Sequence, residues 1–187
     1  MTNNGVASGV VVTLTTAVAL APACAFAVDY MSAEEAAKLM FPQADRFESR
    51  TLAFNAEQLR RLEAAGVSAR SARWQVRLAQ RDGATLGYVV VDDVIGKFEL
   101  ITYAVGIGSD GVVRQVEVLS YRESHGYEIR LPAWRQQFVG KGAAAPLRVG
   151  DDIANISGAT LSCSHVTDGV KRIVAMIDLA RQLGTLA

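Results

Sequence analysis

The chain has 187 residues and carries 19 Lys and Arg against 19 Asp and Glu, so its formal net charge at pH 7 is zero. This balance gives no reason to expect a nucleic-acid partner, because such binding depends on clustered Lys and Arg that neutralise phosphates. All of the charged side chains lie after residue 28, so the chain starts with an uncharged segment unlike the rest.

This uncharged segment has features of an export signal. The apolar run at residues 10–20 is short for a membrane span of roughly 20 residues, and Ala25 and Ala27 fit the A-x-A pattern of a signal-peptidase site. We therefore expect residues 1–27 to be an export signal and residues 28–187 to form a single domain. Because no Lys or Arg precedes the apolar run, an uncleaved anchor is the alternative, and lipidation of Cys24 is a further one.

Two short helices are expected next, each opened by a capping box in which Ser or Asn is followed three residues later by Glu or Gln. The boxes are Ser32 with Glu35 and Asn55 with Gln58. The first helix should stop before Pro42 and the second should close at Gly66. Residues 47–54, between the two helices, have an extended pattern.

The middle of the chain indicates an antiparallel meander. Alternating or continuous apolar segments separated by short turns predict four strands, around residues 74–78, 87–91, 98–107 and 112–121. In the last strand, alternation places Val116, Val118 and Ser120 on one face and Gln115, Glu117 and Leu119 on the other.

A polar loop at residues 122–126 is followed by a short helix around residues 132–139, in which Trp134 and Phe138 are one turn apart. The last element is an amphipathic helix, whose apolar stripe is Val166, Val170, Ile173, Val174 and Ile177. The predicted fold class is therefore α+β, an antiparallel sheet meander covered by helices, with the C-terminal amphipathic helix following an S-G-A-T loop.

Three hydroxyl side chains and a glycine precede this last helix, in the sequence S-G-A-T-L-S at residues 157–162. A helix N-terminus has unpaired backbone N–H groups and a partial positive charge, so hydroxyls and a flexible glycine there suit a phosphate group. The residues alone leave open a second interpretation, an ordinary helix cap with a glycine-containing turn.

The S-G-A-T-L-S segment resembles a motif of the FMN-binding domain family of extracytoplasmic flavoproteins, which includes subunits of the sodium-pumping quinone reductase and Rnf complexes. Similar pieces precede it in the same order, at residues 101–106, 116–118, 122–126 and 137–141, so the resemblance covers roughly residues 98–178. In this family a dedicated FAD:protein FMN transferase joins FMN, through its phosphate, to the Thr hydroxyl of the motif. The resemblance implies a covalent FMN at Thr160, in a loop formed by Ser157, Gly158, Ala159, Leu161 and Ser162.

Two positions depart from the family pattern. The fuller motif has an Asp three residues before the Ser, where this chain has Ala154. The loop that often has the sequence E-T-P-G in the quinone-reductase and Rnf relatives is Glu123, Ser124, His125 and Gly126 in this chain. The resemblance is therefore to the stand-alone exported branch, and it implies that this loop contacts the cofactor. A solvated Glu123 and His125 pair is the alternative.

Other residues have ordinary interpretations beside functional ones. Trp134 and Phe138 suit the core, and stacking on a flavin is the alternative. Cys163 suits a small buried residue, and a reactive thiol at a helix start is the alternative. A metal set built from Cys163, His165, His125 and Glu123 matches no common zinc spacing, and no G-x-S-x-G sequence supports a hydrolase.

We thus expect an exported flavoprotein that carries electrons between a membrane reductase and a periplasmic acceptor, rather than an enzyme with its own substrate. Its location would be the periplasm or the outer face of the cytoplasmic membrane, and its partners would be the flavin transferase and membrane or periplasmic redox proteins. The alternatives are a noncovalent flavin-binding or accessory module of a membrane redox complex, and a flavin-dependent reductase. An ester link would prevent loss of the flavin outside the cytoplasm, where free flavin is dilute.

Overall fold

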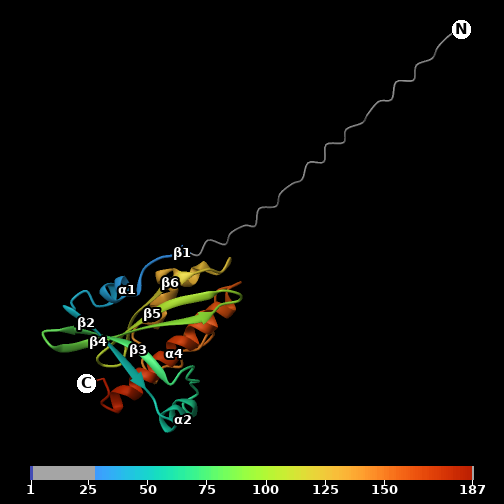
Figure 1. Cartoon of the computed structure of the whole chain (residues 1–187). Helices are drawn as coiled ribbons and strands as arrows, with labels where there is room; N and C mark the ends of the chain where they lie inside the picture. The colour runs from blue at the N-terminus through green and yellow to red at the C-terminus, as the bar shows by residue number, and fades with distance from the viewer. Residues whose placement is uncertain (2–27, 187) are drawn as a thin grey trace.

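The computed structural model describes residues 1 and 28–186, and its centre is one antiparallel sheet (Figure 1). The spatial order of the strands is β1-β6-β5-β4-β3-β2, and every neighbouring pair is antiparallel. The strands are β1 (Val28–Asp29), β2 (Arg46–Ala53), β3 (Arg73–Arg81), β4 (Ala84–Ile95), β5 (Leu100–Gly108) and β6 (Val113–Tyr121). The predicted meander is confirmed, and β2 and β1 extend it at its two edges.

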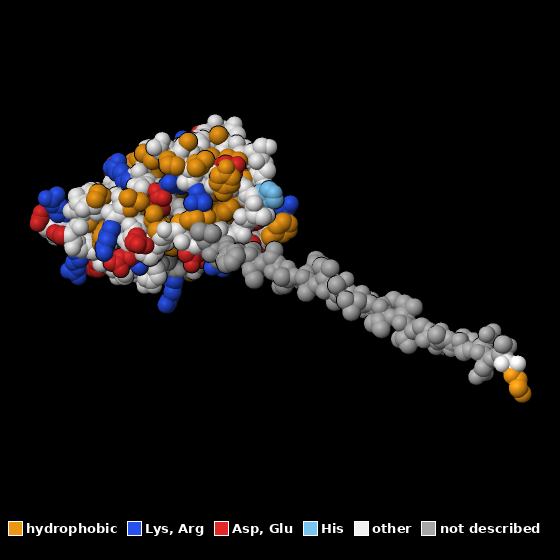
Figure 2. Space-filling model, turned by 90° about the horizontal axis from the view of Figure 1, so that it is seen from above, with side chains coloured by type: hydrophobic (Ala, Val, Ile, Leu, Met, Phe, Trp, Pro, Cys, Tyr) orange, Lys and Arg blue, Asp and Glu red, His pale blue; other side chains and the backbone are white. Residues whose placement is uncertain are grey.

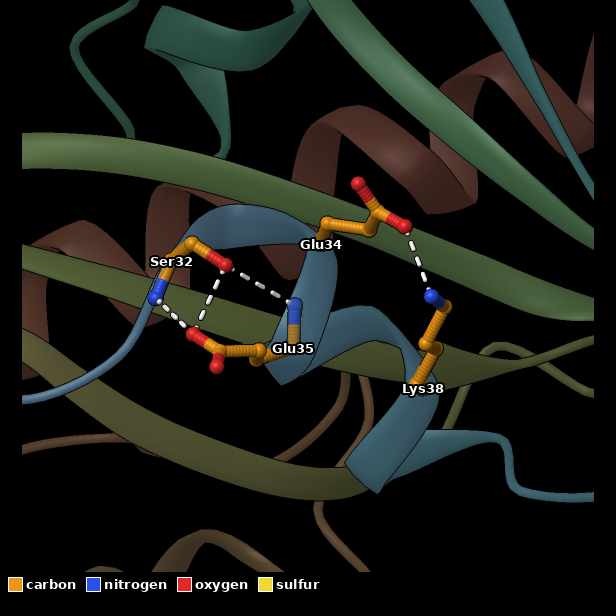
Figure 3. Close-up of polar contacts among 4 residues, drawn as sticks. All are labelled: Ser32, Glu34, Glu35 and Lys38. Atoms are coloured by element: carbon orange, nitrogen blue, oxygen red, sulfur yellow. Dashed lines mark hydrogen bonds and ion pairs between the residues drawn. The ribbon is translucent and has the colours of Figure 1, made fainter.

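The helices and 3-10 turns are α1 (Ala33–Met40), α2 (Ala56–Ala64), η1 (Tyr127–Arg130), α3 (Pro132–Arg135), η2 (Gln136–Phe138) and α4 (Thr160–Gln182). Both predicted capping boxes are present. At α1 the Ser32 hydroxyl accepts a hydrogen bond from the Glu35 N–H at 3.2 Å, and the Glu35 carboxylate accepts one from the Ser32 N–H at 2.7 Å (Figure 3). Lys38 and Glu34 form an ion pair at 2.7 Å on the same helix.

Helices cover both faces of the sheet, and the alternation along β5 shows how. Tyr103 and Val105 belong to the larger buried cluster, which includes the apolar stripe of α4. Ala104 belongs to a second cluster, which α1 covers with Ala36, Ala37 and Met40. Successive strand residues point to opposite faces, so one strand supplies both clusters. The predicted α+β fold and the predicted stripe of α4 are confirmed.

Three predicted boundaries are wrong. The last helix, expected after residues 157–162, begins at Thr160, so the second half of that segment forms the first turn of α4. The strand expected at residues 98–107 begins at Leu100, because Gly96 N–H donates to the Glu99 carbonyl at 2.8 Å and closes a turn over residues 96–99. The helix expected around residues 132–139 is one α-helical turn, α3, followed by the 3-10 turn η2.

The export signal expected at residues 1–27 lies outside the described residues, apart from Met1. Across residues 28–186, none of the helices combines the length and the apolar character needed to cross a bilayer.

Candidate functional site

An open groove with a volume of about 510 Å³ lies where the first turn of α4 meets the loop that follows β6. Its lining comes from three segments: Lys97 and Phe98; Glu123, Ser124 and His125; and Gly158, Ala159, Thr160, Leu161 and Ser162. The volume lies within the range of about 300–1,000 Å³ typical of small-molecule sites. The fold therefore brings together the two segments that the sequence singled out, although they lie far apart along the chain.

Thr160 is the first residue of α4, and its side chain is exposed at the groove. Asn155 Nδ2 donates a hydrogen bond to Thr160 Oγ1 at 3.1 Å, which orients the hydroxyl. In the described part of the chain no side chain caps this helix, whose N-cap residue is Ala159. The N–H groups of the first turn are thus available to an anion, and the helix dipole favours negative charge there.

Gly126 connects the two predicted segments, although it does not line the groove itself. Its φ is +83°, and a Cβ at this position would lie 2.4 Å from Ala159 Cβ and 2.9 Å from Tyr121 Oη. Tyr121 Oη also donates a hydrogen bond to the His125 carbonyl. Burial raises the pKa of Tyr121, so the hydroxyl stays protonated and remains a donor. Residues 121–126 are therefore packed directly against the start of α4.

The polar side chains of this loop have different partners. Ser124 Oγ and His125 Nδ1 form a hydrogen bond at 2.9 Å, and both side chains are exposed. Glu123 Oε1 accepts hydrogen bonds from the backbone N–H groups of Phe98 at 2.6 Å and Glu99 at 3.0 Å. Glu123 and His125 both line the groove, and the Glu123 carboxylate is bonded to another segment. Ser157 is exposed in the same loop as Thr160 but does not line the groove.

Sequence reasoning missed Lys97 and Phe98. The Phe98 side chain is 74% exposed, and Lys97 Nζ lies 4.9 Å from the centroid of its ring. Ile95, Leu100 and Leu161 are also exposed large apolar residues, and Figure 2 shows exposed hydrophobic side chains beside a histidine at one end of the molecule. The sequence feature that could have indicated Phe98 as a site residue is an aromatic residue two positions after a glycine, between two apolar strands.

Trp134 and Phe138 are buried and do not line the groove. Their ring centroids lie 5.1 Å apart in an edge-to-face arrangement, so the core interpretation of this pair is confirmed. Trp134 Nε1 donates to the Ala154 carbonyl at 2.8 Å, and the Ala154 N–H donates to Gln137 Oε1 at 2.7 Å. These bonds fix the backbone of Ala154, whose side chain is exposed.

Cys163 is fully buried one turn into α4, and burial raises the pKa of its thiol. The interpretation of Cys163 as a small buried residue is confirmed, because a reactive cysteine needs exposure and a lowered pKa. Among residues 28–186, no group of three or more His, Cys, Asp and Glu side chains is arranged to bind a metal ion.

Comparison with known proteins agrees with this geometry. Residues 96–175 match the family model of the FMN-binding domain, and this range contains every residue that lines the groove. The chain is 31% identical over 106 residues to a subunit of the ion-translocating oxidoreductase complex of Aliivibrio fischeri strain ES114, and 30% identical to the same subunit of strain MJ11. Each match covers 51% of this chain and 49% of the relative, so the chain spans about half the length of the curated relatives it matches.

The fold resembles a solved structure, that of NqrC from Shewanella oneidensis. The TM-score is 0.53 at 16% sequence identity, and the match covers 79% of this chain and 88% of the NqrC chain. At this identity the likeness concerns the fold alone.

Proposed function

We propose that the protein is an exported electron carrier whose FMN is joined to Thr160, and the match of residues 96–175 to the family model of the FMN-binding domain supports this. One observation carries the proposal. The exposed hydroxyl of Thr160 stands at the uncapped N-terminus of a 23-residue helix and opens onto the groove.

The residues present fit FMN. The first-turn N–H groups of α4 would bind the phosphate, since this helix end has no side-chain cap and carries partial positive charge. Phe98 and Leu161 supply apolar surface for the ring system, while Lys97 and His125 supply polar groups at the same groove. FMN, when bound, supplies one- and two-electron chemistry, and the protein sets its position and surroundings.

The attachment chemistry is a transfer of the FMN moiety from FAD to Thr160. The Thr160 oxygen would form a bond with the FMN phosphorus while the bond from that phosphorus to AMP breaks. The hydroxyl proton would leave to a base of the FAD:protein FMN transferase. Asn155 supports this role, because its amide donates to Thr160 Oγ1 and leaves the hydroxyl hydrogen free to point elsewhere.

Electron carriage rather than turnover of a substrate is supported by the openness of the site. The groove is bordered by the exposed apolar side chains of Phe98 and Leu161, a surface that a redox partner protein could cover. The relatives are named as subunits of an ion-translocating oxidoreductase complex, which supports a membrane redox protein as the partner. We place the domain in the periplasm or at the outer face of the cytoplasmic membrane, with residues 1–27 as the export signal.

The test is the intact mass of the full chain after export from a host that contains the flavin transferase. The wild type should gain the mass of one FMN less water and should stay yellow after denaturation. Thr160→Ala should gain nothing, whereas Ser68→Ala, which removes an exposed hydroxyl outside the motif, should be modified like the wild type.

An unmodified wild type that loses its colour on denaturation would favour the noncovalent module instead. Modification of Thr160→Ala would show that the attachment residue is elsewhere. The N-terminal sequence of the exported protein tests the signal, since cleavage after Ala27 should leave Val28 first.

A further inference from the structure

Part of the groove lining, Lys97 and Phe98, comes from the turn at residues 96–99, which joins β4 to β5. Gly96 N–H donates to the Glu99 carbonyl at 2.8 Å, and the flanking residues Ile95 and Leu100 are paired in the sheet. Phe98 extends from this turn with 74% of its side chain exposed, and it lines the groove. Exposure of so much aromatic surface to water is unfavourable, so an apolar group that covers Phe98 would be bound favourably.

The position of this turn depends on one carboxylate from a distant part of the chain. Glu123 Oε1 accepts the N–H groups of both Phe98, at 2.6 Å, and Glu99, at 3.0 Å. Hydrogen bonds between backbone N–H groups and an ionised carboxylate are shorter and stronger than neutral ones. The turn has one internal backbone bond, and the two bonds to Glu123 hold its tip to another segment of the chain.

Gly96 makes room for this carboxylate. A Cβ at residue 96 would lie 2.5 Å from Glu123 Oε1 and 3.0 Å from Glu123 Cγ. Any side chain at residue 96 would therefore displace Glu123 from the N–H groups that it accepts. Residue 96 must therefore be glycine for Glu123 to bind the turn in this way.

We infer that Glu123 is a positioning residue, which acts by binding the turn and thereby presents Phe98 to the flavin ring. This inference deepens the proposed function and rests on it for the cofactor, whereas the contact between Glu123 and the turn does not depend on FMN. It also assigns Phe98 as a ring contact. The opposing view is that Glu123 acts on the ring through its negative charge.

Two substitutions separate these views. Glu123→Gln removes the charge and keeps an oxygen that can accept the two N–H groups, whereas Glu123→Ala removes both. A positioning role predicts that the turn stays largely restrained in Glu123→Gln and loses its restraint in Glu123→Ala. A role through charge predicts that Glu123→Gln and Glu123→Ala have the same effect, because both remove the charge.

The first measurement is amide hydrogen exchange in the full chain without cofactor. Glu123→Ala should speed exchange of the Phe98 and Glu99 amides by about tenfold to a hundredfold, the factor expected for losing a hydrogen bond to a charged acceptor. Glu123→Gln should speed it several-fold less than Glu123→Ala does, because the amide oxygen still accepts both N–H groups, through neutral bonds that are weaker than the charge-assisted ones. The amides of β6 should be unchanged in both variants, which shows that the fold is intact. Equal acceleration in Gln and Ala, or no acceleration in Ala, overturns the positioning role.

The second measurement is iodide quenching of flavin fluorescence in the FMN-loaded protein. Phe98→Ala and Glu123→Ala should each raise the quenching constant about twofold, because the ring loses its cover, and Glu123→Gln should match the wild type. Since Gln removes the same charge as Ala, it controls for attraction of the iodide anion. An unchanged constant in Phe98→Ala would overturn the assignment of Phe98 as a ring contact. Absence of FMN from the wild type would refute the proposed function and leave the exchange result standing.

Discussion

Replacing Gly126 by Ala is expected to push apart the two loops that form the groove. Gly126 has a φ of +83°, and its Cα faces Ala159, where an added Cβ would approach the Ala159 Cβ to 2.4 Å. Gly158 is a matched control in the second loop. Its φ is also +83°, but an added Cβ would meet nothing within 4 Å.

The magnitudes follow from this difference. An L-residue with a left-handed backbone costs about 1–2 kcal/mol, and this cost applies to both substitutions. Overpacking of a close contact adds about 1–3 kcal/mol, and it applies to Gly126→Ala alone. We therefore expect the free energy of unfolding to fall by about 2–5 kcal/mol for Gly126→Ala and by about 1–2 kcal/mol for Gly158→Ala.

The assay is urea unfolding of the cofactor-free protein, followed by tryptophan fluorescence, with the free energy of unfolding obtained by linear extrapolation. Cofactor-free protein is used because bound FMN would add its own stabilisation. Equal losses in the two variants would refute the reasoning, since they would mean that residue 126 and Ala159 are not in contact.

Three further predictions concern Asp152, Cys163 and Ala154. Burial alone would raise the pKa of Asp152, but hydrogen bonds from Arg148 and Lys141 outweigh it and lower the pKa. Asp152→Asn should therefore cost about 1–2 kcal/mol of unfolding free energy at pH 7, and in pH-dependent urea titrations the difference should shrink below about pH 4, as the wild-type carboxyl is protonated. Cys163 should react with a thiol reagent only after unfolding, because burial raises its pKa and excludes the reagent; rapid labelling of the native protein would contradict this. Ala154→Asp should restore the family motif and raise the flavinylated fraction measured by intact mass, and stability should change by less than about 0.5 kcal/mol because the side chain is exposed. An unchanged fraction would mean that the Asp is not needed in this chain.

The parts of the fold that could be predicted from the sequence are those set by local patterns. The hydrogen bonds of a capping box join residues within a single helical turn, so Ser32 and Asn55 correctly predicted the starts of α1 and α2. Strand alternation held in the middle of β6, where Val116 and Val118 lie in one buried cluster and Leu119 in the other. Val113 and Tyr121 also lie in the first cluster, because the pairing with β5 shifts register twice. By contrast, β1 has only two residues, too few for any periodicity, and it forms because β6 offers an open edge.

The candidate site was predictable only where a family motif marked it. The Thr160 segment and the loop containing Glu123 carry that motif, and the structure brings them to one groove. Phe98 was placed inside a strand because apolar residues follow it. Its actual position depends on a hydrogen bond to Glu123, 25 residues further along the chain, and no local pattern encodes such a contact.

The long helix α4 extends from the groove to the opposite end of the domain. Its first residue, Thr160, lies at the groove, and 23 residues of α-helix extend roughly 34 Å. Its far end lies at the opposite ends of the strands, where Arg181 lies against Gly111 in the β5–β6 turn. Val28, by contrast, pairs with Tyr121, directly before the loop at the groove. If the protein is immobilised on a solid surface, a linker attached after α4 therefore leaves the groove facing the solution. A linker attached before Val28 instead turns the groove toward that surface.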